Sequence, residues 1–377
     1  MLDRYAQDLA GLSGRGRSRM LAPRVGLDFA SNDYLALAES PELAAAASAA
    51  VARGVPVGAG GSRLLRGNHP EHEALEEEAA RFFGAESVLY FSAGFTANEA
   101  LLSTAPQRED LILYDALAHA SAHEGMRLAR APNARFSHND VGAAEDAIRA
   151  WRNKGERGRP WIVVESLYSM DGDKAPLDEL YALATLNDAF LVIDEAHATG
   201  VYGPGGRGLA ARLEGKDNVI TLHTCGKAMG VAGGLLGLPR ILRDFMINRC
   251  RPFIFATAPS PLIAACVRAA LKIIEAADER RGELMARVDF AGAELRRLCA
   301  IEPSGSQIQP IIVGSDIRAT TLASRLQAQG YDIRAIRPPT VPEGSARLRI
   351  ALTLNTRKED IARMVAHLGE ELARLET

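Results

Sequence analysis

The chain has 377 residues, 47% of them hydrophobic, and a formal net charge of −3. A chain of this length can bury a large core, and its near-neutral charge argues against nucleic acid as a main partner. The four cysteines lie in no metal-ligand spacing, no signal peptide is visible at the N-terminus, and no apolar stretch is long enough to span a membrane. We therefore expect a soluble, cytoplasmic protein.

The first part of the chain is predicted to be an N-terminal arm followed by a large α/β domain. Residues 1–40 form the arm, which ends in FASNDYLAL, and residues 70–83 have an amphipathic helical pattern. Short apolar runs then alternate with helical segments, at 87–91, 111–114, 161–165, 190–194 and 219–223. Runs that are hydrophobic on both faces are typical of parallel strands covered by helices. Residues 41–260 are therefore predicted to form a doubly wound, mostly parallel α/β domain.

The pattern changes after about residue 260. A long helical pattern covers 261–301, two strand-like segments (QIQPIIVG and ARLRIALT) follow, and a final amphipathic helix is expected over 358–375. Residues 261–377 are therefore predicted to form a smaller α+β domain that includes a connecting helix.

Polar residues and a glycine turn follow the predicted strands where those strands end. In chain order they are Gly94, His119, Ser169, Asp194 with His197, and Thr224 with Lys227. Ligands of an open parallel sheet bind beyond the carboxyl ends of its strands. We therefore predict a functional site at this edge of the sheet.

Lys227 stands among small residues in the segment TCGKAMGVAGG. A lysine held away from water has its ammonium form disfavoured, so its neutral amine can attack a carbonyl group and form a Schiff base. The alternative interpretation is a lysine whose stem snorkels to water at the start of a helix.

Asp194, in DEAHATG, comes directly at a strand end. A carboxylate there can keep a pyridine ring nitrogen protonated, as pyridoxal 5′-phosphate (PLP) requires. It can equally cap a helix, and metal ligation by Asp194, Glu195 and His197 is a weaker alternative because no second ligand cluster is evident.

SAGFTAN offers backbone N–H groups to a phosphate at a helix start, and His119 is either a ring stacked on a cofactor or an ordinary core histidine. No single residue decides between these interpretations. Taken together, the residues fill every role of a PLP site.

Five motifs carry a resemblance to a known family: FASNDYLAL, SMDGD, DEAHATGVYGPGGRG, TCGKAMG and IRPPTVPEGSARLRIALT. In these motifs the chain resembles the α-oxoamine synthase family, which consists of class-II aminotransferase-like, fold-type-I PLP-dependent enzymes. The resemblance covers nearly the whole chain, from about residue 15 to the C-terminus. It implies that the predicted α/β and α+β domains form the fold-type-I transferase structure.

The resemblance also implies a role for each matching residue. Lys227 forms the Schiff base with PLP, Asp194 pairs with the ring nitrogen, and His119 stacks on the ring. His197 and Ser169 lie near the ring hydroxyl, and Gly94, Phe95 and Thr224 bind the phosphate. Members of the family are homodimers with sites at the interface, so Thr257 is expected to serve the neighbouring site. The resemblance implies that Asn32, Thr340, Arg349 and Arg17 contact the substrate. Arg15 and Arg19 are alternatives to Arg17 in this role.

The implied reaction is a decarboxylative condensation of L-alanine with an acyl thioester of coenzyme A or acyl carrier protein. Other family members join succinyl, acetyl or long acyl thioesters to glycine or serine, and this alternative stays open. Two alternatives from other classes are a catalytically silent partner subunit, which would lack the lysine or the aspartate, and a hydrolase that uses Cys225 near His223. The chain departs from many relatives at Ala93, where they have serine, and at LNTRKED, where they often have an alanine–histidine pair.

Overall fold

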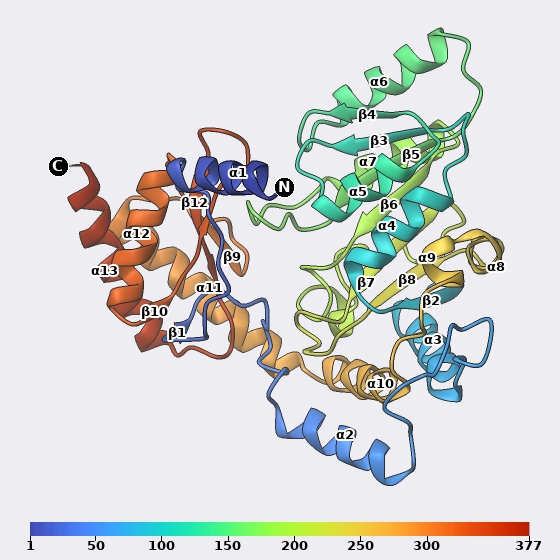
Figure 1. The fold of residues 1–377 in the computed structure, drawn as a ribbon, viewed down its shortest axis with the longest axis horizontal. Coiled ribbons are helices and arrows are strands. Elements are labelled where there is room, and N and C mark those ends of the chain that lie inside the picture. Colours follow the sequence, from blue (N-terminus) through green and yellow to red (C-terminus); the bar gives the residue numbers. More distant parts are fainter. Residues whose placement is uncertain (377) are drawn as a thin grey trace. The chain divides into compact units, whose positions relative to one another are not determined.

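A computed structural model describes residues 1–376, and these residues form two compact units. The larger unit contains Leu35–Ser169 and Lys174–Arg281; the smaller contains Met1–Tyr34, Met170–Asp173 and the described residues from Gly282 onward. Figure 1 labels the elements of both units. Within residues 1–376, no helix combines the length and the apolar character that crossing a bilayer requires.

A seven-stranded sheet forms the centre of the larger unit, with the strand order β2-β8-β7-β6-β5-β3-β4 (Figure 1). The strands from β7 to β4 run parallel to their neighbours, whereas β8 is antiparallel to both β2 and β7. Their bounds are β2 Ser87–Phe91, β3 Leu111–Asp115, β4 Asn133–Phe136, β5 Pro160–Glu165, β6 Phe190–Asp194, β7 Val219–Thr224 and β8 Gly234–Leu238. The five predicted strands are confirmed, while β4 and β8 were not predicted.

Helices cover both faces of this sheet, and strand β5 shows why its sequence is continuously apolar. Trp161 and Val163 pack with α4 (Gly94–Thr104), α5 (Ala120–Leu128), α8 (Arg240–Arg249) and α9 (Arg251–Ile254). Ile162 and Val164, which point to the other face, pack with α6 (Val141–Asn153) and α7 (Leu177–Leu186). Alternate side chains of one strand therefore enter two different cores, as the doubly wound prediction requires.

The remaining helices of the larger unit are α2 (Pro41–Ala52), α3 (Pro70–Phe83), α10 (Pro261–Glu275) and the short 3-10 helix Pro204–Gly206. The predicted helix over 70–83 is confirmed as α3. Its start is fixed by Pro70 and by the His69 side chain, which accepts a hydrogen bond from the backbone N–H of Glu71 at 3.1 Å. It ends at Gly84, whose φ of 87° is left-handed.

The smaller unit contains a three-stranded antiparallel sheet in the order β11-β12-β9 and a parallel pair of β1 and β10. Helices α11, α12 and α13 pack with these strands around one apolar core. The bounds are α1 Asp3–Gly14, β1 Leu27–Asp28, α11 Asp278–Cys299, β9 Ile308–Gly314, α12 Asp316–Ala328, β10 Tyr331–Asp332, β11 Ala335–Ile336, β12 Ala346–Ala351 and α13 Lys358–Glu376. The predicted α+β character of this part and its final helix are confirmed.

The compact units differ from the predicted domains at both boundaries. Residues 1–34 of the arm belong to the smaller unit, because β1 pairs with β10 and the backbone N–H of Ala351 donates to the carbonyl of Phe29 at 2.9 Å. Helix α10 belongs to the larger unit, because it packs against α2 and α3. The division therefore falls inside α11, between Arg281 and Gly282.

Candidate active site

A cavity in the larger unit lies at the carboxyl ends of its parallel strands. The predicted site residues that line it are Gly94, Phe95, His119, Asp194, His197, Thr224 and Lys227. Each of them follows or ends a strand: β2, β3, β6 or β7. The structure therefore brings together seven of the nine residues predicted to bind the cofactor.

Asp194 is the last residue of β6 and is 8% exposed. Its Oδ1 accepts a hydrogen bond from the backbone N–H of Ala196 at 2.9 Å, and its Oδ2 accepts one from Asn98 Nδ2 at 2.7 Å. Asn98 in turn donates to Ser121 Oγ at 3.0 Å. The carboxylate is thus held in one orientation by two donors from the protein.

His119 caps the N-terminus of α5, because its Nδ1 accepts a hydrogen bond from the backbone N–H of Ser121 at 3.2 Å. Burial lowers the pKa of His119; the charge of Asp194 acts against this shift and that of Lys227 adds to it. The ring is therefore neutral at pH 7, and since Nδ1 is an acceptor, Nε2 carries the proton. A flat, neutral ring is suited to stacking on another ring. Its edge-on neighbour is Phe95, at 6.4 Å between ring centroids.

Helix α4 begins at this cavity without a side-chain cap at Ala93, so its first backbone N–H groups are not used by a capping side chain. Thr224 lies beside this helix start and donates from Oγ1 to the carbonyl of Gly233 at 3.3 Å. A Cβ atom at Gly94 would lie 3.0 Å from Thr224 Oγ1. The helix start and a hydroxyl therefore form a close-packed cradle suited to an anion.

Lys227 is half-buried in a tight turn that Gly230 makes possible. The backbone N–H of Gly230 donates to the carbonyl of Lys227 at 2.9 Å, and Gly230 has a φ of 68°. A Cβ atom at Gly230 would lie 2.5 Å from the backbone nitrogen of Ala38, so only glycine fits there. The small residues around the lysine thus serve close backbone packing.

The geometry around Cys225 argues against the alternative that this residue is the nucleophile of a hydrolase. The thiol is fully buried, and burial raises the pKa of Cys225, so its thiolate is not available at pH 7. The ring of His223 is engaged elsewhere: Nδ1 is 2.8 Å from Thr199 Oγ1 and Nε2 is 2.7 Å from Glu214 Oε1. These residues form a buried structural network.

Two further predicted cofactor residues do not line this cavity. Ser169 is buried, and its backbone N–H donates to Glu165 Oε2 at 2.9 Å. Thr257 is exposed and lines a different cavity of the larger unit, together with Tyr90 and Phe253. Their predicted roles stay predictions.

The predicted substrate residues all belong to the smaller unit. Arg349 is 6% exposed, and its Nη2 donates to Asn32 Oδ1 at 2.9 Å and to Tyr34 Oη at 3.2 Å. Arg17 forms ion pairs of 2.6 Å with both Asp316 and Glu343, so the structure already gives its guanidinium two carboxylate partners.

Thr340 is exposed, and its backbone N–H donates to the carbonyl of Arg337 at 3.0 Å. The contacts of these side chains with substrate stay predictions.

Three polar residues that the sequence interpretation missed also line the cavity of Lys227: Asn98, Ser121 and Glu165. Glu165 is the last residue of β5 and could have been found by the same strand-end rule that identified Asp194. Asn98 and Ser121 lie inside helices, where the sequence gives no such signal.

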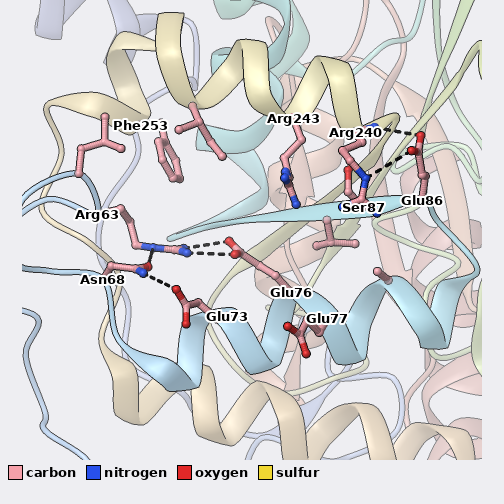
Figure 2. Close-up of a pocket in the computed structure, with 14 residues that line it drawn as sticks. Arg63, Asn68, Glu73, Glu76, Glu77, Glu86, Ser87, Arg240, Arg243 and Phe253 are labelled. Carbon is pink, nitrogen blue, oxygen red and sulfur yellow. Dashed lines mark hydrogen bonds and ion pairs between the residues drawn. The ribbon is translucent and has the colours of Figure 1, made fainter.

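A second cavity shows that size alone does not identify the site. At about 490 Å³ it is larger than the cavity of Lys227, which is about 50 Å³. Several of its charged residues pair with one another (Figure 2): both terminal nitrogens of Arg63 donate to Glu76, and the backbone N–H of Arg240 donates to Glu86. No predicted site residue lines this cavity. Among residues 1–376, no group of three or more His, Cys, Asp or Glu side chains is arranged to hold a metal ion.

Comparison with known proteins identifies the class. Residues 24–368 match the family model described as aminotransferase class I and II. The chain therefore belongs to the aminotransferase class I and II family.

Individual relatives indicate which enzymes of this family the chain is similar to. The 8-amino-7-oxononanoate synthase of Azoarcus sp. strain BH72 is 40% identical over 389 residues, covering 98% of this chain and 97% of the relative. A solved 8-amino-7-oxononanoate synthase from Francisella tularensis is 26% identical, with a TM-score of 0.79, and 93% of this chain and 99% of that chain are covered. A serine palmitoyltransferase from S. paucimobilis with bound PLP and myriocin is 23% identical, with a TM-score of 0.88. The match covers 100% of this chain and 98% of that chain.

These similarities confirm the predicted fold-type-I architecture and the resemblance to the α-oxoamine synthases. Within that family, the sequence motifs most resemble 8-amino-7-oxononanoate synthase, which is also the name of the relative that is 40% identical.

Proposed function

We propose that this protein catalyses the PLP-dependent condensation of L-alanine with a pimeloyl thioester to give 8-amino-7-oxononanoate, a step of biotin biosynthesis. In this reaction a bond forms between Cα of alanine and the acyl carbon, and the thiol carrier and CO₂ leave. The observation that carries the proposal is the 40% identity with such a synthase over nearly the whole of both chains.

The donor set of the Lys227 cavity fits PLP. It offers an amine, a carboxylate held by two donors, a neutral imidazole and a helix start beside the hydroxyl of Thr224. When bound, PLP supplies an aldehyde that condenses with an amine and a ring that accepts the negative charge developing at the substrate Cα.

The residues of the larger unit then have distinct tasks. Lys227 would hold the cofactor through Nζ, and as a free amine it would remove the proton from Cα of alanine. Asp194 holds a proton on the ring nitrogen of the cofactor. His119 covers the ring face and excludes water, while Thr224 and the start of α4 bind the phosphate.

In the smaller unit, Arg349 binds the carboxylate of the amino acid through its guanidinium. Asn32 and Tyr34 support this role, because their side-chain oxygens accept hydrogen bonds from Nη2 and fix the orientation of the guanidinium. Arg17 and Thr340 are the weaker candidates for substrate contact.

We further propose that the enzyme is a cytoplasmic homodimer in which Thr257 serves the site of the neighbouring subunit. In support, Thr257 is exposed and lies two residues after Phe255, which is 71% exposed, and Leu65 on another loop is 84% exposed. Large exposed apolar side chains are typical of surfaces that a partner covers. All four cysteines have free thiols, as expected in a reducing compartment.

The alternative from the sequence analysis stays the second candidate: an α-oxoamine synthase that uses glycine or serine with another acyl thioester. The TM-score with the serine palmitoyltransferase, 0.88, exceeds that with the solved 8-amino-7-oxononanoate synthase, 0.79. At 23% identity this likeness shows the fold alone, so the 40% identical relative carries more weight for the substrate. A silent subunit is disfavoured, because Lys227 and Asp194 line one cavity.

The deciding experiment measures thiol release by the purified enzyme with pimeloyl-, succinyl- and palmitoyl-CoA against alanine, glycine and serine. We expect the highest kcat/KM with alanine and pimeloyl-CoA. Borohydride should attach PLP covalently to Lys227, and Lys227→Ala should abolish turnover while circular dichroism shows an unchanged fold. Highest kcat/KM with succinyl-CoA and glycine would contradict the proposed substrates, and full activity of Lys227→Ala would contradict the mechanism.

A further inference from the structure

Glu165 is a buried carboxyl group in the Lys227 cavity that the mechanism above does not use. It ends β5, is 3% exposed and lines the same cavity as Lys227 and Asp194. Its Oε2 accepts the hydrogen bond from the backbone N–H of Ser169 at 2.9 Å. Its Oε1 is buried and has no hydrogen-bond partner among residues 1–376.

An unpartnered buried oxygen is costly, because a polar group that loses water needs a hydrogen bond in return. Native structures leave few such groups, and a binding or catalytic role is one of the reasons for which they are kept. Glu165 lines the cavity of Lys227, so a ligand bound in that cavity can supply the partner of Oε1.

The charges around Glu165 decide whether it acts as a donor or an acceptor. Asp194 occupies the matching position on the neighbouring strand β6, so two carboxyl groups lie side by side at the sheet edge. The other titratable groups lining the cavity are Lys227, His119 and His197. Two adjacent buried carboxyl groups do not both ionise readily.

Of the two, Asp194 is the one held by donors, since it accepts hydrogen bonds from Asn98 and Ala196. Burial, and then the negative charge of Asp194, raise the pKa of Glu165 to about 8, although Lys227 and Ser169 act in the opposite direction. Glu165 is therefore neutral at pH 7. Because Oε2 is an acceptor, the proton is carried by Oε1.

We propose that Glu165 is a positioning residue which, as a neutral carboxyl group, donates a hydrogen bond from Oε1 to an oxygen of the ligand in the Lys227 cavity. The acceptor is an anionic oxygen, either the ring oxygen of the cofactor or the carboxylate of the amino acid substrate. This inference rests on the proposed function, since it assumes that PLP occupies the cavity.

The test uses purified holoenzyme and two variants of similar volume. Glu165→Gln keeps a neutral side chain that can donate a hydrogen bond, whereas Glu165→Met keeps the shape and removes the donor. Three quantities are measured: the dissociation constant of PLP by titration of apo-enzyme, that of alanine from the absorbance change of the bound cofactor, and the pKa read from that absorbance without substrate. Circular dichroism and Tm of the apo-proteins report folding.

We expect Glu165→Gln to leave all three quantities close to those of the wild type. Glu165→Met should weaken one ligand by about tenfold or more, the loss typical of a hydrogen bond to a charged group. Weaker PLP binding assigns the acceptor to the cofactor, whereas weaker alanine binding with unchanged PLP binding assigns it to the amino acid. The proposal is overturned if the Met variant binds both ligands as well as the wild type, or if the Gln variant is as weak as the Met variant.

The Gln variant tests the protonation state even if the Met variant does not fold. An ionised Glu165 would lose its charge in Glu165→Gln, and the spectroscopic pKa of the bound cofactor would then fall by about one unit or more. That result overturns the proposal. Infrared difference spectra of wild type minus Glu165→Gln at pH 7 should contain the carbonyl stretch of a protonated carboxyl group, and its absence overturns the proposal as well.

These readouts separate this inference from the proposed function. Binding of PLP, its spectrum and the infrared band do not depend on which acyl thioester is the substrate. If the wild type prefers succinyl-CoA, the proposed substrate fails while the role of Glu165 stands. If the wild type does not bind PLP, the proposed function fails first.

Discussion

The carboxylate of Asp194 is the residue on which the electronic role of the cofactor depends. It is buried and oriented by Asn98 and by the backbone N–H of Ala196, so its position is fixed before any ligand binds. We expect Asp194→Asn to bind PLP but to lower kcat by about 100-fold or more, because a neutral amide cannot hold the ring nitrogen in its protonated form. Steady-state kinetics and the absorbance spectrum of the bound cofactor check this prediction.

Asn98→Ala is the matched comparison for Asp194→Asn, since it removes one donor to the carboxylate and keeps its charge. A loss of about tenfold in kcat, smaller than that of Asp194→Asn, is expected. Equal activity of Asp194→Asn and the wild type would contradict the assigned role of the carboxylate.

The same residues show how far the sequence predicts the site. Asp194, His119 and Lys227 could be predicted because each ends or follows a strand that is recognisable from its apolar run. Glu165 was missed although it ends such a run, because a charged residue at a strand end is also an ordinary solvent boundary. Its burial depends on neighbouring strands that are distant in sequence, and only the fold shows this.

At the scale of elements, Asp115 organises the loop between β3 and α5, which carries His119. It is fully buried and accepts hydrogen bonds from the backbone N–H groups of Leu117 and Asn139 and from His138 Nδ1, each at 2.8 Å. Burial alone would raise the pKa of Asp115, but these hydrogen bonds outweigh burial and the net shift is downward.

The direction of this pKa shift determines how the free energy of unfolding changes with pH. The pKa of Asp115 in the folded state lies below that of the unfolded chain, about 3.9. Its stabilisation is therefore complete above the unfolded-state pKa and is lost as the pH falls through the folded-state pKa. We expect Asp115→Asn to lower the free energy of unfolding by about 2 kcal/mol at pH 7, and by less below a pH of about 4.

Urea denaturation at pH 7 and at pH 3 measures this difference. Asp146→Asn is the control, since the Asp146 side chain is 74% exposed, and we expect a change within about 0.5 kcal/mol. A loss for Asp115→Asn that is equally large at both pH values would show that the charge is not the stabilising feature.

Strand β8 packs directly against the start of α4, which forms part of the site. A Cβ atom at Gly234 would lie 2.8 Å from backbone atoms of Ala93 and Gly94, where α4 begins. Because backbone atoms cannot move aside as a flexible side chain can, Gly234→Ala should displace the start of α4. We expect about 1–3 kcal/mol lower stability and weaker PLP binding, measured by urea denaturation and by titration of apo-enzyme. Gly282→Ala, which has no atom within 4 Å of its added Cβ, should leave PLP binding unchanged.

Strand β8 is also one of the two strands that the sequence did not predict. Its residues GLLGL contain two glycines, which are unfavourable in strands and are typical of turns. The packing reason is tertiary, because a Cβ atom at Gly237 would lie 2.6 Å from Thr221 Oγ1 of β7. Strand β4 (NARF) was missed because it is a short edge strand with only Phe136 fully buried. The parallel central strands were predicted because both of their faces are covered.

At the scale of the whole molecule, the sequence predicts the order of elements better than their grouping. The sequence analysis predicted residues 1–40 as a separate arm. Its place in the smaller unit depends on the short parallel pairing of Leu27 with Tyr331 and of Asp28 with Asp332. A pairing of two residues across such a sequence distance leaves no local pattern. The grouping of α10 also leaves no local pattern, because α10 packs against α2 and α3, and these helices lie far from it in sequence, near the start of the larger unit.

The proposed dimer can be tested by combining two defective chains. Lys227→Ala should be inactive, and Thr257→Ala should bind PLP about tenfold more weakly, since one hydrogen bond to the phosphate is lost. A mixed dimer of these two chains contains one site with an intact Lys227 and with Thr257 of the partner subunit. We therefore expect about half of the wild-type activity at a PLP concentration that leaves the Thr257→Ala homodimer mostly empty.

The mixed dimer is isolated with two affinity tags, and its mass is checked by light scattering. If Thr257 instead served the site of its own chain, no site in the mixed dimer would contain both native residues. Its activity would then be no higher than half that of the Thr257→Ala homodimer at the same PLP concentration. A monomeric wild type at the assay concentration would contradict the proposal directly. Because Thr257 is exposed and does not line the Lys227 cavity of its own chain, the result with half of the wild-type activity is the one we expect.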